Sequence, residues 1–248
     1  MPFYEREKEL LTAIEKSEYV SISTLLKSQY TSISTLRRDL IKLEEKGLII
    51  RTHGGVMAVK KSPDDKIAFF LREGEQSDEK KVIANKAAEL VCDGDTVMLD
   101  ASTSAYCIIP YLAEKCKEII VITSGAKASY LLGELGINNI CTGGKMITKS
   151  FSYVGQTAEE TVLRYNADIA FFSCRGLSES GYLTDNSVEE NDLRRTMIKQ
   201  SKRNFLLCNS DKFGHTCLNN LCHISEIDGI ISDGDIPENI LRLLNNNS

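Results

Sequence analysis

Apolar positions recur at helical spacing in three short stretches at the start of the chain. The spacing predicts a first helix over residues 4–16, a shorter second helix from Ser21 and a third helix over residues 32–47. A tight turn at residues 28–31 joins the last two. Two helices joined in this way, preceded by a packing helix, form a helix-turn-helix arrangement.

The third stretch, SISTLRRDLIKLEEKG, has two chemically different faces. Thr31 and Ser32 can cap its N-terminus, and Gly47 is a natural stop. The apolar face, which we expect to pack on the rest of the segment, holds Ile33, Leu36, Leu40 and Leu43. The opposite face holds short hydroxyls and two guanidinium groups, from Ser34, Thr35, Arg37 and Arg38. A helix with these donors near its N-terminus suits the major groove of DNA.

After Gly47 the apolar residues no longer recur at helical spacing and instead form short runs typical of strands. Two short apolar runs, residues 48–51 and 56–59, flank a glycine pair and predict a β-hairpin. A hairpin directly after a recognition helix is a wing, and wing residues near the tip can contact backbone phosphates. We therefore expect a winged helix-turn-helix whose DNA contacts are Ser32, Ser34, Thr35, Arg37, Arg38, Arg51 and His53. The alternative is a small helical domain that binds another protein, because amphipathic three-helix patterns are common.

From residue 77 onward, short continuous apolar runs alternate with helical segments. The runs predict strands at 96–99, 118–123, 138–141, 169–173, 204–208 and 229–232. This alternation indicates an α/β fold with a mainly parallel sheet covered on both faces. The preceding segment is polar apart from an aromatic patch at 68–71, which we expect to dock on one of the two domains. The expected organisation is a DNA-binding domain at 1–61, a linker at 62–76 and an α/β domain at 77–248.

Charge is distributed unevenly between these parts. Residues 1–61 carry 11 Lys and Arg against 8 Asp and Glu, a balance of +3, whereas the whole chain carries −5. A basic head on an acidic body indicates a polyanionic partner for the head. No apolar run approaches the about 18 residues that cross a bilayer, so we expect a cytoplasmic protein with no membrane partner. The 8 cysteines are expected to be reduced and mostly in apolar surroundings, among them Cys92, Cys107, Cys174 and Cys208.

Ligands of parallel α/β sheets bind at the carboxyl ends of the strands. The first such end is the segment 100–104, DASTS, where hydroxyls and free N–H groups at a helix N-terminus can hold an anion such as phosphate. Ordinary helix capping would explain the same residues. Thr123 and Ser124 follow the next strand, and Gly143 and Gly144 follow the third, where glycine lets the backbone approach a ligand closely. The spacing is not that of a nucleotide P-loop.

Three charged residues later in the chain are further candidates. Glu190 and Arg194 lie one helical turn apart, and Lys212 follows a predicted strand, where it can supply a point charge for a phosphate. The alternative for Lys212 is a solvated surface lysine.

Two sets of motifs resemble those of a known family. The string Ser32-x-x-Thr35-Leu36-Arg37-Arg38-Asp39-Leu40, followed by Leu43-Glu44-x-x-Gly47 and Arg51-Thr52-His53-Gly54-Gly55, resembles the signature of the DeoR family of bacterial transcriptional regulators. The segments LDAST at 99–103, VITS at 121–124, GG at 143–144, 190–197 and SDKFG at 210–214 resemble the DeoR-type sensor domain. That domain is similar in fold to ribose-5-phosphate isomerase.

The resemblance implies a regulator whose sensor domain binds a phosphorylated sugar. Together with the strand-end argument, it places effector contacts at Asp100, Ser102, Thr103, Ser104, Thr123, Ser124, Gly143, Gly144, Glu190, Arg194 and Lys212. Three positions depart from the family's usual residues, which are glycine at Ser102, aspartate at Asn209 and lysine at Arg194. Ser102 narrows its loop, Asn209 removes a carboxylate acceptor, and Arg194 keeps the charge but changes its geometry. These departures predict an atypical effector or weaker binding.

Four possible zinc ligands, His215, Cys217, Cys222 and His223, lie within nine residues. Their spacing fits no standard zinc finger, so we expect neither a metal site nor a cofactor. The expected function is a repressor of sugar-metabolism genes that binds double-stranded operator DNA. We expect a homo-oligomer, a dimer or tetramer, because a single head offers little contact area.

The rival interpretation is an enzyme, namely a sugar-phosphate isomerase or hydrolase with a helical appendage. Asp100, Glu190 and Lys212 are chemically capable of acid–base catalysis. We expect no enzymatic activity, because an enzyme has no need of a basic winged head and the family resemblance implies sensing without turnover.

Overall fold

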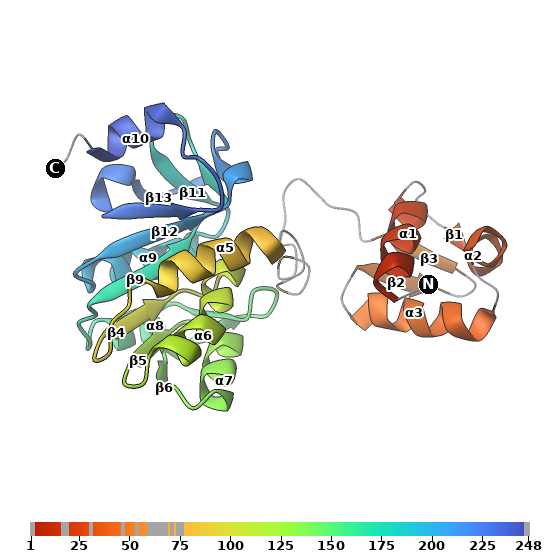
Figure 1. Ribbon diagram of the computed structural model, residues 1–248, viewed down its shortest axis with the longest axis horizontal. Helices are drawn as coiled ribbons and strands as arrows, with labels where there is room; N and C mark the ends of the chain where they lie inside the picture. Colours follow the sequence, from red (N-terminus) through yellow and green to blue (C-terminus); the bar gives the residue numbers. More distant parts are fainter. Residues whose placement is uncertain are drawn as a thin grey trace. The chain divides into compact units, whose positions relative to one another are not determined.

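The computed structural model describes residues 3–15, 20–29, 32–45, 48–52, 55–58, 69, 72 and 77–245 (Figure 1). The chain divides into two units, Met1–Gly74 and Glu75–Ser248, and each is described by itself. Phe69 in the predicted linker is buried, while most of residues 62–76, together with Gly47 and His53, lies outside the described residues. The domain boundaries drawn from the sequence and the docking of the aromatic patch stay predictions.

The N-terminal unit has the three predicted helices and the predicted hairpin. The helices are α1 (Phe3–Glu15), α2 (Ile22–Gln29) and α3 (Ile33–Glu45), and the hairpin strands are β2 (Ile49–Thr52) and β3 (Gly55–Ala58). Strand β1 (Val20–Ser21) adds a third antiparallel strand in the order β1-β3-β2. Its two residues are too few to produce a period-2 signal, so the sequence pattern missed it.

One apolar cluster joins the helices of this unit to its sheet. Its buried side chains are Leu10, Ile14, Val20, Leu25, Leu36, Leu40, Leu43, Ile49 and Val56. The prediction that Ile33 belongs to the apolar stripe of α3 was wrong, because this side chain is 45% exposed. Ile33 is the first residue of α3, and a helical side chain leans toward the N-terminus, here past the end of the core.

A buried ion pair also ties α1 to α3. Asp39 is 1% exposed on the packed side of α3, and its two carboxylate oxygens accept hydrogen bonds from Arg6 Nε (2.7 Å) and Nη2 (3.2 Å). This bidentate pair fixes the rotation of α3 about its axis, and therefore determines which of its side chains face outward.

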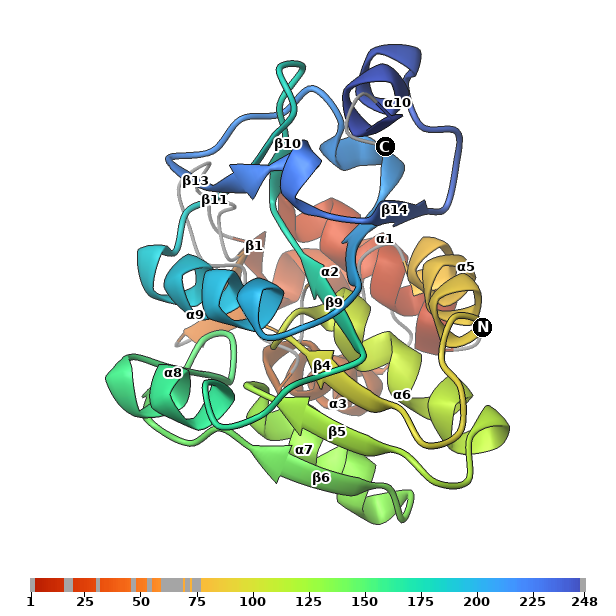
Figure 2. The same ribbon diagram turned by 90° about the vertical axis from the view of Figure 1, so that its left-hand side faces the viewer.

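The C-terminal unit is built on a six-stranded parallel sheet in the order β14-β12-β9-β4-β5-β6 (Figure 2). In chain order the strands are β4 (Thr96–Leu99), β5 (Ile120–Thr123), β6 (Asn138–Cys141), β9 (Ile169–Ser173), β12 (Asn204–Cys208) and β14 (Gly229–Ser232). All six predicted strands are confirmed, although the second begins at Ile120 rather than at residue 118.

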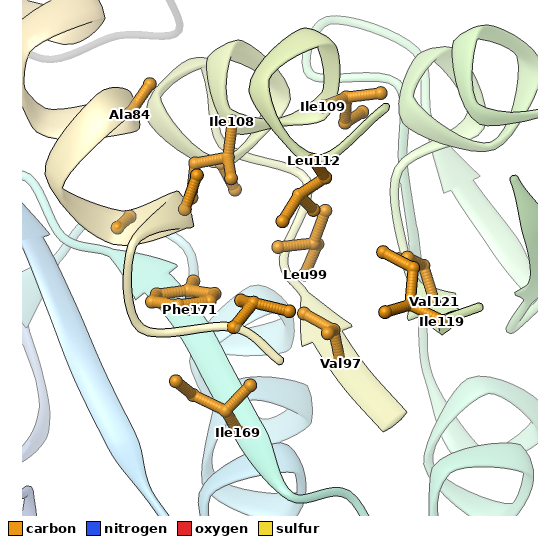
Figure 3. Packing of buried hydrophobic residues seen from close by; sticks show 14 of the residues in the cluster. Ala84, Val97, Leu99, Ile108, Ile109, Leu112, Ile119, Val121, Ile169 and Phe171 are labelled. Atoms are coloured by element: carbon orange, nitrogen blue, oxygen red, sulfur yellow. The ribbon is translucent and has the colours of Figure 1, made fainter. Parts of the chain in front are cut away.

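Helices cover both faces of the sheet, as the continuous apolar strands predicted. One face packs against α5 (Ser77–Ala88), α6 (Thr103–Lys115) and α7 (Ala126–Glu134), and part of the other packs against α8 (Gln156–Val162) and α9 (Val188–Lys199). Successive side chains of β4 point to opposite faces of the sheet. Leu99 packs under α6 with Phe171 (Figure 3), whereas Met98 packs with residues of α8 and α9 on the other face.

The remaining elements cover β9 and β12 on the second face. A small antiparallel sheet, β10-β11-β13, consists of β10 (Gly176–Leu177), β11 (Tyr182–Asp185) and β13 (Asn219–His223). It packs with α10 (Glu238–Asn245) on Phe172 and Leu206. The short elements are a hairpin of β7 (Lys145–Ile147) and β8 (Ser152–Val154) and the 3-10 turns η1 (Ser210–Lys212) and η2 (Ile224–Glu226).

All eight cysteines are free thiols. Cys116, Cys174, Cys208 and Cys222 are buried, but the expectation of apolar surroundings was wrong for Cys92, which is exposed in the turn after α5. No helix among the described residues is both long and apolar enough to span a membrane.

Candidate DNA-contacting surface and effector site

The outward face of α3 carries the predicted DNA contacts. Ser34, Arg37 and Arg38 are exposed and Thr35 is partly exposed, while Leu36 and Leu40 on the other side are at most 1% exposed. Neither Arg37 nor Arg38 has a carboxylate partner in the described part of the chain. Two unpaired guanidinium groups on the solvent side of a packed helix are available to phosphates or to guanine edges.

The ends of α3 are fixed by short contacts. At its N-terminus the carbonyl of Ser32 accepts from Leu36 N–H (3.2 Å), and the Ser32 and Ser34 hydroxyls share a hydrogen bond of 2.6 Å. At its C-terminus, Glu44 accepts from both Nε (2.6 Å) and backbone N–H (3.2 Å) of Arg51. Arg51 therefore ties β2 to α3, and its terminal nitrogens remain the part that can contact a phosphate.

Asp100 organises the carboxyl edge of the parallel sheet in the second unit. Its side chain is buried, Oδ1 accepts from Ser102 N–H (3.0 Å), and Oδ2 accepts from Ser173 N–H (3.2 Å) and Arg194 Nε (2.8 Å). The carboxylate thus joins the ends of β4 and β9 to α9. With three donors already bound, its structural role is to hold the neighbouring loops.

Arg194 lies at the centre of a buried charge cluster. Its Nη1 donates to Asp185 Oδ2 (3.0 Å) and Asn191 Oδ1 (3.1 Å), and its Nη2 lies 3.9 Å from Glu190. Burial alone would lower the pKa of Arg194, but the carboxylates of Asp100, Asp185 and Glu190 outweigh it and raise this pKa, so the group is always charged.

The structure therefore brings Asp100 together with the pair Glu190 and Arg194, which the sequence had singled out in a distant segment. It adds Asp185, at the end of β11, which the sequence reasoning missed. The available signal was an aspartate three residues before the first residue of α9, but no strand was predicted there to place it at a sheet edge.

Lys212 is not a solvated surface lysine. It is partly buried in η1, directly after β12, and its Nζ donates to Ser173 Oγ (2.8 Å). The Ser173 hydroxyl in turn donates to the carbonyl of Leu207 (2.7 Å). A cation is thus fixed at the same edge of the sheet as the N-terminus of α6.

Ser102 is the N-cap of α6 and has an ordinary extended backbone, with φ −71° and ψ 153°. Its hydroxyl accepts from Ala105 N–H (3.1 Å), so a serine fits here without backbone strain. The N–H groups of Thr103 and Ser104 have no acceptor among the described residues. Two free amides at a 13-residue helix N-terminus favour an anion.

The loops after β5 and β6 continue this edge. The Thr123 hydroxyl accepts from Gly125 N–H (3.0 Å), and Ser124 N–H donates to the Leu99 carbonyl (3.4 Å). Both side chains are buried. The first contact stabilises the turn of the β5 loop, and the second holds this loop against the end of β4. Both residues therefore serve the structure of the edge.

The two glycines after β6 differ. A Cβ on Gly144, which has φ +105°, would lie 2.8 Å from the carbonyl oxygen of Val154, so glycine is required there by packing against β8. Gly143, with φ +66°, has open space where its Cβ would be. Of the two, Gly143 is the one whose surroundings leave room for a ligand.

The four possible zinc ligands are not gathered into a site. His223 is held by Ser225 Oγ (2.7 Å from Nδ1) and by the Ser180 carbonyl (3.1 Å from Nε2). Cys222 is buried in the core between the small sheet and α10, where burial raises its pKa to about 12. In the part of the chain that the structure describes, no three His, Cys, Asp or Glu side chains converge on a point that could hold a metal ion.

Residues 75–234 match the family described as the DeoR C terminal sensor domain, and residues 6–62 match the DeoR-like helix-turn-helix domain. The chain belongs to the DeoR family. It is a transcriptional regulator with an N-terminal winged helix-turn-helix and an α/β sensor domain, as the motifs of both parts indicated.

Relatives of this DeoR-family chain align over nearly its whole length. An uncharacterized HTH-type transcriptional regulator of Bacillus subtilis, YulB, is 30% identical over 241 residues, covering 97% of this chain and 92% of the relative. The L-fucose operon activator of Haemophilus influenzae is 31% identical, with coverage of 96% and 94%. The glycerol-3-phosphate regulon repressor of Escherichia coli is 26% identical, with coverage of 97% and 94%.

Among solved structures, ribose 5-phosphate isomerase A of Methanocaldococcus jannaschii is similar to this DeoR-family chain with a TM-score of 0.43 and 18% identity. The match covers 56% of this chain and 55% of the isomerase.

Proposed function

We propose that this regulator represses sugar-metabolism genes in the cytoplasm by binding operator DNA as a homo-oligomer, and that a phosphorylated sugar or related metabolite controls its DNA affinity. The observation that carries the DNA-binding part is α3, whose apolar side is buried while Arg37 and Arg38 face outward without carboxylate partners in the described chain. A helix that served only to pack would not need two unpaired cations on its exposed side.

The effector part is supported by the carboxyl edge of the sheet. Lys212 and the free amides of Thr103 and Ser104 are positive or partly positive groups at neighbouring strand ends. Together they suit a phosphate. Relatives whose names refer to L-fucose and to glycerol 3-phosphate favour a phosphorylated sugar or polyol.

The same edge argues against the enzymatic alternative. Acid–base catalysis by Asp100 would require a carboxylate oxygen that faces the substrate, but this carboxylate is bound by two backbone amides and by Arg194. Freeing this carboxylate for catalysis would break its buried ion pair with Arg194, which is strongly destabilising. The proposed role is therefore sensing without turnover.

The DNA-binding part is tested by selecting duplexes from a random-sequence pool with the full chain and measuring affinity for the enriched sequence. Arg37→Ala should weaken specific binding by roughly tenfold or more, since a bidentate base contact contributes about 1–3 kcal/mol. Arg164→Ala, which removes the same charge from an exposed position of the sensor domain, should leave affinity unchanged. No enriched sequence, or equal affinity for both variants, would instead favour a protein-docking role for the head.

The effector part is tested by thermal unfolding of the full chain with ribose 5-phosphate, fructose 1-phosphate and glycerol 3-phosphate, each compared with its unphosphorylated form. A ligand that binds only the native state must raise the melting temperature. Isomerised or hydrolysed product, with turnover that disappears in Glu190→Gln, would establish the enzyme instead. A reporter gene behind the selected operator separates repression from activation, since relatives of both kinds are known.

A further inference from the structure

Two buried thiols at the ends of neighbouring strands are used by neither part of the proposed function. Cys208 is the last residue of β12 and is fully buried, and Cys174 directly follows β9 and is 4% exposed. The two strands are parallel neighbours in which Leu207 pairs with Ser173, so the same register places Cys208 beside Cys174. Both side chains belong to the core under the small sheet and α10. The two thiols therefore lie next to each other on one face of the sheet.

The spacing of these two residues suits a disulfide that is easily reduced. In-register residues of neighbouring strands have Cα atoms about 4.8 Å apart, within the range of about 4.4–6.8 Å that disulfides span. Their side chains leave the sheet in the same direction, so the Cβ atoms keep about the same spacing, which exceeds the ~3.8 Å mean for disulfides. The bond therefore needs a small backbone shift, which Cys174 can supply because it lies outside β9. Strained disulfides of this kind are reversible rather than structural.

The surroundings make Cys174 the more reactive thiol of the pair. A hydrogen bond with the Cys208 thiol lowers the pKa of Cys174 against the effect of burial, and the charges of Lys212 and Arg194 lower it further. The same hydrogen bond, together with burial, raises the pKa of Cys208 well above its ordinary value, so this thiol stays protonated. The Sγ of Cys208 also lies 3.6 Å from the carbonyl of Asn209, a second acceptor for its proton. Because the thiolate is the nucleophilic form, Cys174 should react first.

We propose that Cys174 and Cys208 are a redox-active pair, which a hydroperoxide oxidises to a disulfide and a thiol reductant restores. The thiolate of Cys174 attacks one peroxide oxygen, so that an S–O bond forms, the O–O bond breaks and the leaving oxygen takes up a proton as alcohol or water. The sulfur of Cys208 then attacks the sulfenic acid, and the hydroxyl leaves with the Cys208 proton as water. The two sulfurs together lose two electrons, which reduce the one peroxide bond.

The position of the pair connects its oxidation to the carboxyl edge of the sheet. Ser173, the residue before Cys174, donates its N–H to Asp100 (3.2 Å) and accepts from Lys212 Nζ (2.8 Å). A backbone shift at Cys174 therefore acts on both contacts. Disulfides of proteins in a reducing compartment are mostly transient and regulatory, which agrees with a bond that closes at a ligand-binding edge and opens again.

The test oxidises the full chain and identifies the linked peptides. The reduced chain is treated with hydrogen peroxide at a concentration that oxidises exposed Cys92, quenched with acid, unfolded in N-ethylmaleimide and digested with trypsin. The two thiols fall on different tryptic peptides, residues 165–175 and 204–212, and neither peptide contains another cysteine. We expect the two peptides to be joined, at a mass two hydrogen atoms below their sum, and to separate in dithiothreitol. Recovery of Cys174 and Cys208 as maleimide adducts would overturn the inference.

Two variants separate the pair from its surroundings. In Cys208→Ser the sulfenic acid of Cys174 cannot be resolved, so dimedone should capture it on residues 165–175. Cys222→Ser removes another buried thiol of the same core and should leave the yield of the linked peptides unchanged. Linkage of Cys174 to Cys222, or loss of the linked peptides in Cys222→Ser, would assign the oxidation to another pair and refute the inference. The peptide map of the wild-type chain needs no substitution, so it decides the question even where a variant fails to fold.

Discussion

Replacing Arg194 with methionine should strongly destabilise the sensor domain. Methionine fills much of the same volume but carries no charge, so the substitution isolates the ionic contribution. Arg194 lies 2.8 Å from Asp100, 3.0 Å from Asp185 and 3.9 Å from Glu190. The arginine side chain is 7% exposed and those of Asp100 and Asp185 are 2% and 6% exposed, so water cannot replace the lost partner.

The magnitude follows from the unpaired charges that remain. Removing one partner of a buried ion pair costs about 3–5 kcal/mol, because the other is left uncompensated. For a unit of this size each kcal/mol lowers the melting temperature by about 2–4 °C, so a fall on the order of 10 °C is expected. Differential scanning calorimetry of the full chain measures it directly.

Two further variants separate the ionic effect from a general loss of packing. Arg242→Met removes an exposed arginine paired with Glu238 and should change stability by at most about 0.5 kcal/mol. Adding Asp100→Asn to Arg194→Met removes one uncompensated charge, so the double variant should be less destabilised than the sum of the two single variants. A loss below about 1 kcal/mol in Arg194→Met, or strict additivity, would refute the description of this cluster as a tightly coupled charge network.

Three smaller predictions test other contacts. Asp39→Asn should weaken operator binding as well as stability, because Asp39 and Arg6 fix the rotation of α3; DNA titration and thermal unfolding measure the two effects. A hydrogen bond from Lys202 and, to a lesser extent, one from the backbone N–H of Thr96 lower the pKa of Asp168 below 3.8. The ionised carboxylate therefore stabilises the fold above pH 3.8, and this stabilisation is lost as the pH falls through the pKa of the folded state. Asp168→Asn should reduce the loss of stability in this acidic range, measured by thermal unfolding as a function of pH. Iodoacetamide at pH 8 should label exposed Cys92 before Cys222, whose buried thiol stays protonated; peptide mass spectrometry measures the order.

The parallel sheet could be predicted because its strands are buried on both faces. A run such as Ile169–Ser173 is continuous and apolar, and the intervening helices give the alternation that marks an α/β fold. The small sheet escaped prediction for the opposite reason. Strand β10 has two residues, and β11 reads Tyr-Leu-Thr-Asp, of which only Leu183 is buried and aliphatic. Such strands are specified by their contacts with β9 and β12, which a single-sequence pattern does not reveal.

The site residues were predictable as positions but not as roles. The strand-end rule found Asp100, Ser102 and Lys212. Periodicity could not distinguish the roles of Asp100 and Lys212. The carboxylate of Asp100 is bound by Arg194, whereas Lys212 makes a hydrogen bond to the Ser173 hydroxyl and is proposed to bind the ligand. That distinction depends on Asp185, which comes from a different sheet and approaches Arg194 only in the folded chain. Non-local charge pairing of this kind leaves no spacing signal in the sequence.

The charge network also limits how an effector can act. An effector that displaced Arg194 from Asp100 would leave a buried carboxylate unpaired, a cost of about 3–5 kcal/mol that its own contacts would have to offset. Contacts with Lys212 and the α6 amides carry no such penalty, because the amides have no acceptor to lose in the described chain and Lys212 gives up a single neutral hydroxyl contact. We therefore expect the effector to bind beside the network, which then acts as a rigid support. The effector can change DNA affinity only if it binds the two states of the regulator with different affinity. We expect that difference to come from its contacts with the N-terminus of α6 and with η1.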